Sequence, residues 1–118
     1  MKKRYRYSLR PAYGSKDLLL EFIIDDPGSA FDRDLFSALD DLQPDITALQ
    51  DLWMNDEIIL TISCTKGELL YSKDIWGFAF IMAQYNQECV IAIDEILQKS
   101  ELFLKEEVDY EDYRKSSA

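Results

Sequence analysis

Two pairs of short apolar runs, each pair joined by a few turn residues, constrain the fold of this chain most. Residues 5–9 alternate between apolar and basic or polar side chains, and a nearly continuous apolar run follows at 18–24. Residues 57–64 alternate in the same way, and a turn separates them from the run at 68–71. Alternation with a period of two is typical of half-buried strands, so we expect two β-hairpins. The arginine-bearing first strand is expected at an edge of the sheet, where charged side chains deter aggregation.

Helical spacing dominates the remaining apolar pattern. Phe31, Leu35, Leu39 and Leu42 predict a helix with Ser29 as its N-cap and Pro44 at its end. Ile46, Leu49, Leu52 and Trp53 predict a second short helix. Residues 73–99 carry two apolar stripes, which predict one long helix. The alternative for this last segment is a strand over 75–82 followed by a shorter helix.

These elements predict the α+β class. We expect a single domain over residues 1–118, because 118 residues leave room for one domain. Its sheet should be small, mixed or antiparallel, with about five strands, one of them over residues 100–106. One long C-terminal helix and one or two shorter helices should pack against it. The tail, residues 108–118, is highly charged and is expected to fray.

The charge distribution points to a class of partner. The formal net charge is −10, yet residues 1–16 carry six basic side chains and no acidic one. Residues 17–57 carry twelve acidic side chains and one basic one, Arg33. An acidic field repels nucleic acid and anionic membranes and attracts cationic partners. We therefore expect a protein partner and no binding to nucleic acid or membrane. Solubility alone is the alternative explanation for the charge.

The side chains needed for common catalytic mechanisms are missing from the sequence. There is no histidine, which removes the commonest general base and zinc ligand. Cys64 and Cys89 lie in apolar surroundings and are expected to be buried thiols. The carboxylate groups at 25–26, 32–34 and 109–112 do not match a calcium loop. We therefore expect no enzyme, no catalytic residues, no cofactor and no metal, although an enzyme that uses carboxylates alone stays open.

The N-terminal residues do not resemble a secretory signal. Met1, Lys2, Lys3 and Arg4 are followed by no apolar segment of the usual length. The longest apolar stretch, residues 75–83, is far shorter than the ~20 residues that span a bilayer. A cytoplasmic location is therefore the expectation.

The C-terminal part of the chain resembles a known class of proteins. The residues concerned are Gly67, the run Tyr71-Ser72-Lys73-Asp74-Ile75-Trp76, the run Phe80-Ile81-Met82-Ala83, Asn86-Gln87, and the ending with Ser100, Phe103, Lys105, Val108-Asp109-Tyr110 and Tyr113. Together they resemble small bacterial immunity proteins of contact-dependent growth inhibition and related polymorphic toxin systems. The resemblance covers roughly the last 45 residues and implies no catalytic residues. It implies a cytoplasmic antidote that binds the toxic C-terminal domain of a cognate effector, commonly a nuclease.

The acidic segment is the candidate binding surface. A toxin that acts on DNA or RNA presents a cationic cleft to phosphates, and clustered carboxylates fit such a cleft. We expect the partner-binding residues to be Asp32, Asp34, Asp40, Asp41, Asp45 and Asp51, with Trp53 as an aromatic anchor if it is exposed. The alternatives are a solvated acidic face, core packing for Trp53, and a different function as an acidic adaptor or regulatory module without a toxin partner. The oligomeric state is left open.

Overall fold

The computed structural model describes residues 5–12, 15–24, 30–52, 54 and 56–114. The strands are β1 (Tyr5–Pro11), β2 (Leu18–Ile23), β3 (Asp45–Leu52), β4 (Glu57–Cys64), β5 (Gly67–Asp74), β6 (Phe78–Met82) and β7 (Phe103–Lys105). The helices are α1 (Phe31–Ala38), the 3₁₀ turn η1 (Asp40–Leu42), α2 (Gln87–Lys99) and α3 (Glu111–Arg114). Both predicted hairpins are present, as β1–β2 and β4–β5. The predicted N-cap Ser29 lies outside the described residues.

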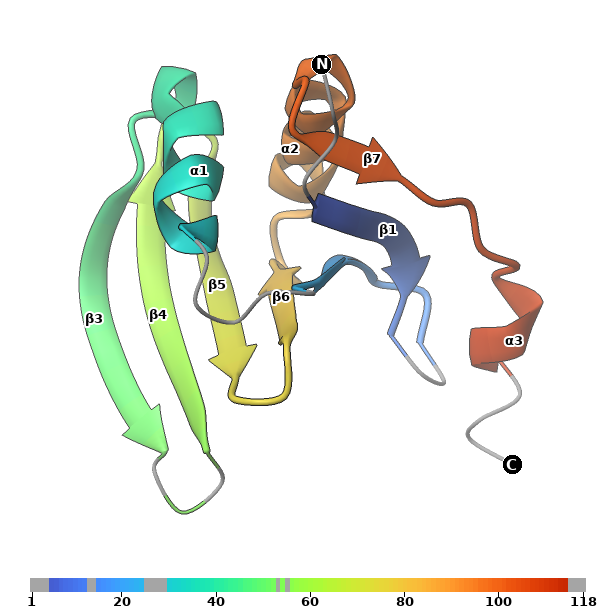
Figure 1. Cartoon of the computed structure of the whole chain (residues 1–118), viewed down its shortest axis with the longest axis horizontal. Helices are drawn as coiled ribbons and strands as arrows, with labels where there is room; N and C mark the ends of the chain where they lie inside the picture. The colour runs from blue at the N-terminus through green and yellow to red at the C-terminus, as the bar shows by residue number, and fades with distance from the viewer. Residues whose placement is uncertain (1–4, 13–14, 25–29, 53, 55, 115–118) are drawn as a thin grey trace.

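All seven strands join one mixed sheet in the order β3-β4-β5-β6-β2-β1-β7. The pairing is antiparallel except between β1 and β7, which run parallel. The sheet is strongly twisted, so that β1 and β7 lie at a steep angle to β3, β4 and β5 (Figure 1). The α+β class is as predicted, whereas the sheet is larger than the expected five strands.

Both long helices pack on the same face of the sheet. Tyr7 and Phe22 are direct cross-strand neighbours, so their side chains share a face. The Tyr7 hydroxyl donates to Asp94 of α2, and the Phe22 ring lies 5.4 Å from the ring of Phe31 at the start of α1. One continuous apolar core therefore lies between the sheet and the two helices.

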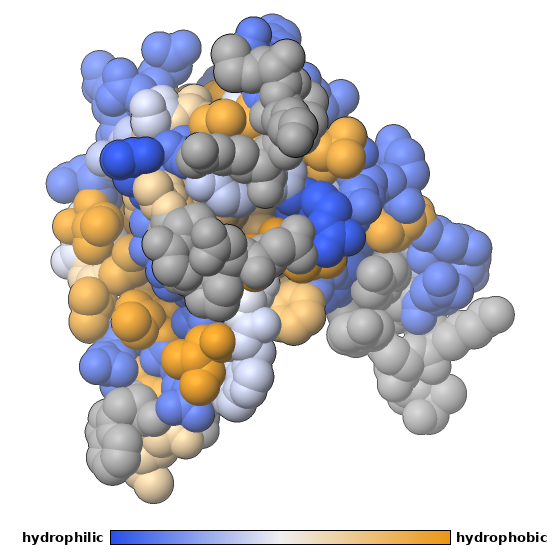
Figure 2. Space-filling model, viewed as in Figure 1, coloured by the Kyte–Doolittle hydropathy of each residue, from blue (hydrophilic) through white to orange (hydrophobic). Residues whose placement is uncertain are grey.

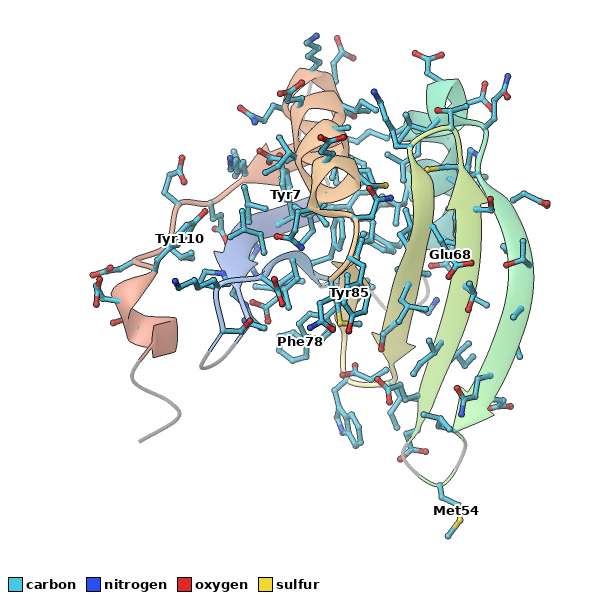
Figure 3. The ribbon with its side chains drawn as sticks, turned by 180° about the vertical axis from the view of Figure 1, so that it is seen from behind. Tyr7, Met54, Glu68, Phe78, Tyr85 and Tyr110 are labelled. Carbon is cyan, nitrogen blue, oxygen red and sulfur yellow. The ribbon has the colours of Figure 1, made fainter. Side chains whose placement is uncertain are left out.

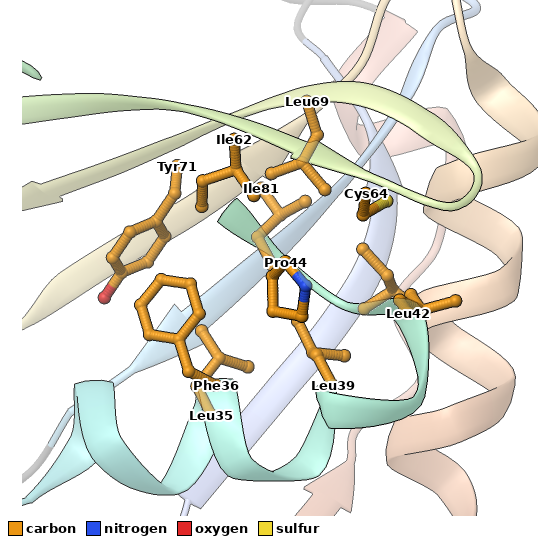
Figure 4. A pocket seen from close by; sticks show the side chains of 11 residues that line it. Leu35, Phe36, Leu39, Leu42, Pro44, Ile62, Cys64, Leu69, Tyr71 and Ile81 are labelled. Carbon is orange, nitrogen blue, oxygen red and sulfur yellow. The ribbon is translucent and has the colours of Figure 1, made fainter. Parts of the chain in front are cut away.

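Helix α1 closes the core over β4, β5 and β6. Figure 4 shows its apolar side chains pointing toward those of the strands, around a void of about 10 Å³. The ring of Phe36 meets the ring of Tyr71 edge-on at 5.9 Å. A void of this size has room for about one water molecule, so it is a packing defect rather than a ligand cavity.

The long helix predicted over residues 73–99 is wrong. Strand β5 continues to Asp74, a turn containing Gly77 follows, β6 runs antiparallel to β5, and only Gln87–Lys99 is helical. The alternative of a strand followed by a shorter helix is confirmed in outline. Gly77 has a φ of +94°, and a Cβ added to it would lie 2.7 Å from the Ile24 carbonyl oxygen. A helix cannot pass through this position because a positive φ lies outside the right-handed helical region.

The short helix predicted from Ile46 to Trp53 is also wrong, because residues 45–52 form strand β3. The register of β3 against β4 shifts between Ile46 and Ala48, which marks a β-bulge. The extra residue, Thr47, changes the parity of the strand, so that Ile46 and Leu49 point to the same face. Apolar residues three apart on one face look helical in sequence, which explains the wrong prediction.

One smaller expectation also needs correction. Strand β1 is not an edge strand, because β7 pairs with its outer side. Arg10 of β1 is only 5% exposed and donates from Nε to Glu21 Oε1 at 2.9 Å. The charged tail contains a helical turn, α3, which lies beside β1, and the expected fraying of the tail stays a prediction.

Candidate functional site

The first two predicted site residues, Asp32 and Asp34, are engaged within the fold. Asp32 accepts from the Tyr71 hydroxyl at 2.6 Å and from Lys73 Nζ at 2.8 Å. Asp34 accepts from the Tyr5 hydroxyl at 2.6 Å, and its side chain is only 12% exposed. Both carboxylates sit on the side of α1 that meets the sheet. We therefore assign them to holding α1 in place and leave them out of the candidate site.

Asp40, Asp41 and Asp45 are brought together at one end of the sheet. Gln43, in the left-handed conformation with a φ of 53°, reverses the chain between η1 and β3. This reversal places the exposed acids of η1 beside the first residue of β3. The three aspartates line an open depression of about 820 Å³, together with Phe36, Gln43, Pro44 and Ile46. The structure thus brings these three predicted residues together beside Phe36, Pro44 and Ile46, and their role in binding stays a prediction.

Asp51 lies apart from this group. It stands on the same strand as Asp45, six residues further along, and six residues of extended chain span roughly 20 Å. Asp51 is exposed and pairs across the ladder with Ile58 of β4. Trp53 lies outside the described residues, so its assignment as an anchor stays a prediction.

Exposed apolar side chains accompany these acids. Leu49 is 65% exposed, Ile46 52% and Ile58 41%, and the ladder register places all three on the helix-bearing face. Helix α1 does not reach across them. Figure 2 shows hydrophobic side chains gathered over β3 and β4, on the flank of the molecule that carries the free edge. We call Ile46, Leu49, Ile58, Asp40, Asp41, Asp45 and Asp51 together the β3 surface.

A second exposed apolar surface lies near β6, on the sheet face opposite the helices. Leu19, Met82 and Leu70 are cross-strand neighbours on β2, β6 and β5. They line a groove of about 780 Å³ that also includes Tyr85, which is 96% exposed. Figure 3 shows Tyr85 and Phe78 beside β6 and Glu68 on β5. We call this the β6 groove.

Sequence reasoning missed the β6 groove for an identifiable reason. Tyr85 and Met82 fall within residues 73–99, where the apolar spacing predicts one long helix with a wide buried face. Trp76, assigned to the same helix, is 65% exposed in the turn between β5 and β6. The signal that was available is the pair Asp74 and Gly77, a side-chain acceptor followed by a glycine. Such a pair is typical of a turn.

Three polar side chains in the interior of the fold have raised pKa values. Burial raises the pKa of Tyr71, and its hydrogen bond to Asp32 raises it further. Burial and then the hydrogen bond to Asp94 likewise raise the pKa of Tyr7. Burial and then the neighbouring Cys64 thiol raise the pKa of Cys89 to about 12; the two sulfurs lie 3.8 Å apart and are not bonded. At neutral pH these groups are protonated hydrogen-bond donors and poor nucleophiles.

Within the described part of the chain, no group of three or more Cys, Asp or Glu side chains is placed to hold a metal ion. No helix in that same part is long and apolar enough to cross a membrane. No family model, curated protein sequence or solved structure matches this chain. The two surfaces defined above are therefore the features from which a function can be argued.

Proposed function

We propose that this chain is an immunity protein that binds and neutralises the toxic C-terminal domain of a cognate contact-dependent growth inhibition effector. The toxin domain would be a nuclease with a basic cleft, and binding would take place in the cytoplasm. The observation that carries the proposal is the β3 surface, where exposed apolar side chains lie beside clustered carboxylates. Such a combination fits a cationic protein surface, with apolar contacts at the centre and charges at the rim.

The resemblance to immunity proteins supports the proposal from a separate part of the chain. Its residues lie at the two ends of β5, in the turn to β6, in β6, at the start of α2, in β7 and in the segment that follows β7. Several of them hold the fold together. The Asn86 side chain donates to the Lys66 carbonyl at 2.6 Å, and the Gln87 side chain bonds to the backbone of Leu18. None of these residues belongs to the β3 surface, which is free to differ between partners.

The acids of η1 and β3 would act mainly on the rate of association. Asp40, Asp41 and Asp45 are all exposed, so their attraction for a basic cleft is long-ranged and screened by salt. Electrostatic steering of this kind raises association rates by roughly tenfold or more at low ionic strength. Ile46 and Leu49 would then supply the short-range contacts that slow dissociation.

A pull-down from lysate of the source bacterium tests the proposal. The tagged chain is washed at low and then at moderate salt, and bound proteins are identified by mass spectrometry. We expect recovery of the C-terminal fragment of a large secreted protein. Changing Asp40, Asp41 and Asp45 together to Asn should lower the association rate by about tenfold and weaken retention at moderate salt.

The matched control removes the same charge from another surface. Changing Glu95, Glu101 and Glu107 to Gln neutralises three exposed acids of α2 and the segment after it. This control should retain the fragment as the unmodified chain does. If neither variant affects capture, the antidote function stands and the binding surface is elsewhere. If no such fragment is recovered while the effector is expressed, the antidote proposal fails and an acidic adaptor becomes the working model.

A further inference from the structure

The two edges of the sheet differ in how well they are protected. Strand β7 is one edge and has three residues, whereas β3 is the other edge and has eight. Edge strands in natural proteins are usually short, or carry lysine or proline that discourages further pairing. Strand β3 contains neither lysine nor proline, and its first seven residues are exposed. Its outer row of backbone N–H and C=O groups has no strand partner among the described residues.

The bulge near its start divides β3 into two parts. Residues Ala48–Leu52 pair in an unbroken register with Glu57–Thr61 of β4. This stretch of five residues is as long as an average strand, and its geometry is regular. Leu49 and Asp51 point to the helix-bearing face, and Gln50 points to the other face. An added strand would therefore pair with Ala48–Leu52, since the shifted register at Thr47 interrupts the ladder there.

The negative charge around β3 determines which kind of strand can pair with its free edge. Asp45 and Asp51 stand near the two ends of β3, Asp40 and Asp41 lie close to its start, and β3 itself has no basic residue. A second copy of the chain would place its own Asp45 and Asp51 along the same ladder. Each copy would also bring a formal net charge of −10. Like charges on neighbouring strands destabilise pairing, so the charges favour a basic strand from a different protein.

We propose that β3 accepts an added β-strand, basic and in part apolar, from the toxin domain. The added strand would pair with the backbone of Ala48–Leu52, place a lysine or arginine next to Asp51, and cover Leu49 with an apolar side chain. Main-chain hydrogen bonds would supply affinity, and the alternating side chains would supply specificity. This inference rests on the proposed function and specifies how the β3 surface is used.

Amide hydrogen exchange of the full chain tests this mode of binding. The probe, called the lysine–valine peptide, is an acetylated, amidated seven-residue peptide with lysine and valine alternating at positions 1, 3, 5 and 7 and threonine at positions 2, 4 and 6, so that lysine and valine share one face. In the free chain, alternate amides within Ala48–Leu52 point away from β4 and should exchange fast. At a peptide concentration about ten times the dissociation constant, their exchange should slow about tenfold, because only the free form exchanges. Changing Asp51 to Asn should weaken the effect several-fold, whereas Glu95→Gln should not.

A second peptide separates strand pairing from simple charge attraction. It has the same two lysines, but its third and fourth residues are replaced by proline, which removes N–H groups from both sides of the peptide and prevents a ladder. We expect no protection of Ala48–Leu52 from this peptide. Equal protection by both peptides, protection confined to the β6 groove, or no protection at the highest soluble concentration would each overturn the inference. So would protection in the free chain that grows with protein concentration, which would identify a second copy as the occupant.

The inference and the proposed function fail in different ways. Suppose that the pull-down captures the effector fragment but the lysine–valine peptide does not protect the β3 amides. This result would reject strand addition and would leave the antidote function standing. Suppose instead that the peptide protects the β3 amides but the pull-down recovers no effector. This result would support β3 as an edge that accepts a strand and would reject the antidote function.

Discussion

Three tyrosine hydroxyls donate to aspartate carboxylates between elements that are far apart in sequence. The pairs are Tyr5–Asp34, Tyr7–Asp94 and Tyr71–Asp32, at 2.6, 2.9 and 2.6 Å. Hydrogen bonds from a hydroxyl to an ionised acceptor are short and strong, and a buried phenol needs such a partner. These carboxylates therefore join the helices to the sheet.

Replacing Tyr71 by Phe should change the response of the protein to alkaline pH. The pKa of Tyr71 in the folded state lies above its ordinary value of 10.0, so its stabilising effect is fully present below about pH 10. As the pH rises further, the unfolded chain ionises first and stability falls. Tyr71→Phe should cost about 1 kcal/mol at pH 7 and should make the fall above pH 10 shallower by up to about 1.4 kcal/mol per pH unit.

Urea unfolding at a series of pH values between 7 and 11 measures this effect. Tyr85, which is 96% exposed, supplies the control, because Tyr85→Phe should leave both the stability at pH 7 and the alkaline slope unchanged. If the free energy of unfolding fell equally steeply with pH above pH 10 in Tyr71→Phe and in the unmodified chain, that result would contradict the assigned role of Tyr71.

The sequence identified the acids but could not separate those that anchor the fold from those on its surface. Asp32 and Asp40 both lie off the apolar stripe of the predicted helix, which favours exposure for both. What separates them is a phenol on β5, 39 residues away from Asp32 in the chain. Sequence periodicity reports the face of an element and contains no information on a partner so distant. Asp40, Asp41 and Asp45 were predicted as surface residues, but their grouping depends on the reversal at Gln43 and on strand β3, where a helix was predicted.

At the scale of elements, the turn between β5 and β6 decides the architecture of the second half of the chain. The Asp74 side chain accepts hydrogen bonds from the backbone N–H groups of Trp76 and Phe78, at 2.9 and 3.1 Å. The Gly77 carbonyl accepts from the Ile24 N–H at 2.7 Å. The turn is thus fixed on both sides. The apolar spacing of residues 73–99 fits a helix equally well, and only the turn excludes it.

Replacing Gly77 by Ala should destabilise the protein by about 2 kcal/mol or more. An L-residue at this positive φ is strained, and its Cβ would lie 2.7 Å from the Ile24 carbonyl oxygen, in a residue whose own N–H donates to the Gly77 carbonyl. Chemical denaturation measures the loss. Ser63→Ala, at an exposed strand position, should stay within about 0.5 kcal/mol of the unmodified chain. Equal stability of the two variants would contradict the described turn.

Helix α2 is held to the sheet by a buried carboxylate. Asp94 is 5% exposed and accepts from the Tyr7 hydroxyl, from Lys105 Nζ of β7 at 3.0 Å and from the Gln98 side chain at 3.0 Å. Asp94→Ala should cost about 3 kcal/mol, because it leaves a buried hydroxyl and a partly buried ammonium without their acceptor. Thermal unfolding compared with Glu95→Ala, an exposed neighbour, measures the difference. A similar melting temperature for both variants would contradict this role of Asp94.

At the scale of the whole molecule, a cluster of aromatic rings joins the first and last strands to α1. Phe103 of β7 is 1% exposed, and its ring lies 5.2 Å from Tyr5, 6.1 Å from Phe22 and 6.3 Å from Phe31. The sequence predicted a short strand in this region. It could not predict that the strand would pair with β1, because a run of three residues fixes neither its partner nor its direction. The number of strands was underestimated for a different reason, because the segments that form β3 and β6 were predicted to be helical.

Replacing Phe103 by Ala should therefore cost about 3–5 kcal/mol, the range for a buried aromatic side chain. The neighbouring residue, Leu104, is 45% exposed and points to the opposite face of the sheet, so Leu104→Ala should cost much less. Urea unfolding of both variants measures the difference. A small loss in Phe103→Ala would show that β7 adds little to the fold.

The parallel pairing of β1 with β7 also determines when the sheet can be completed during synthesis. Tyr5 lies beside Phe103, so the first strand waits for its outer neighbour until residues 103–105 have left the ribosome. Long-range pairing of this kind is slow to form compared with local helices and hairpins. Under the proposed antidote function, a cell would therefore be protected by copies completed earlier, and each new copy would contribute only after β7 had docked against β1.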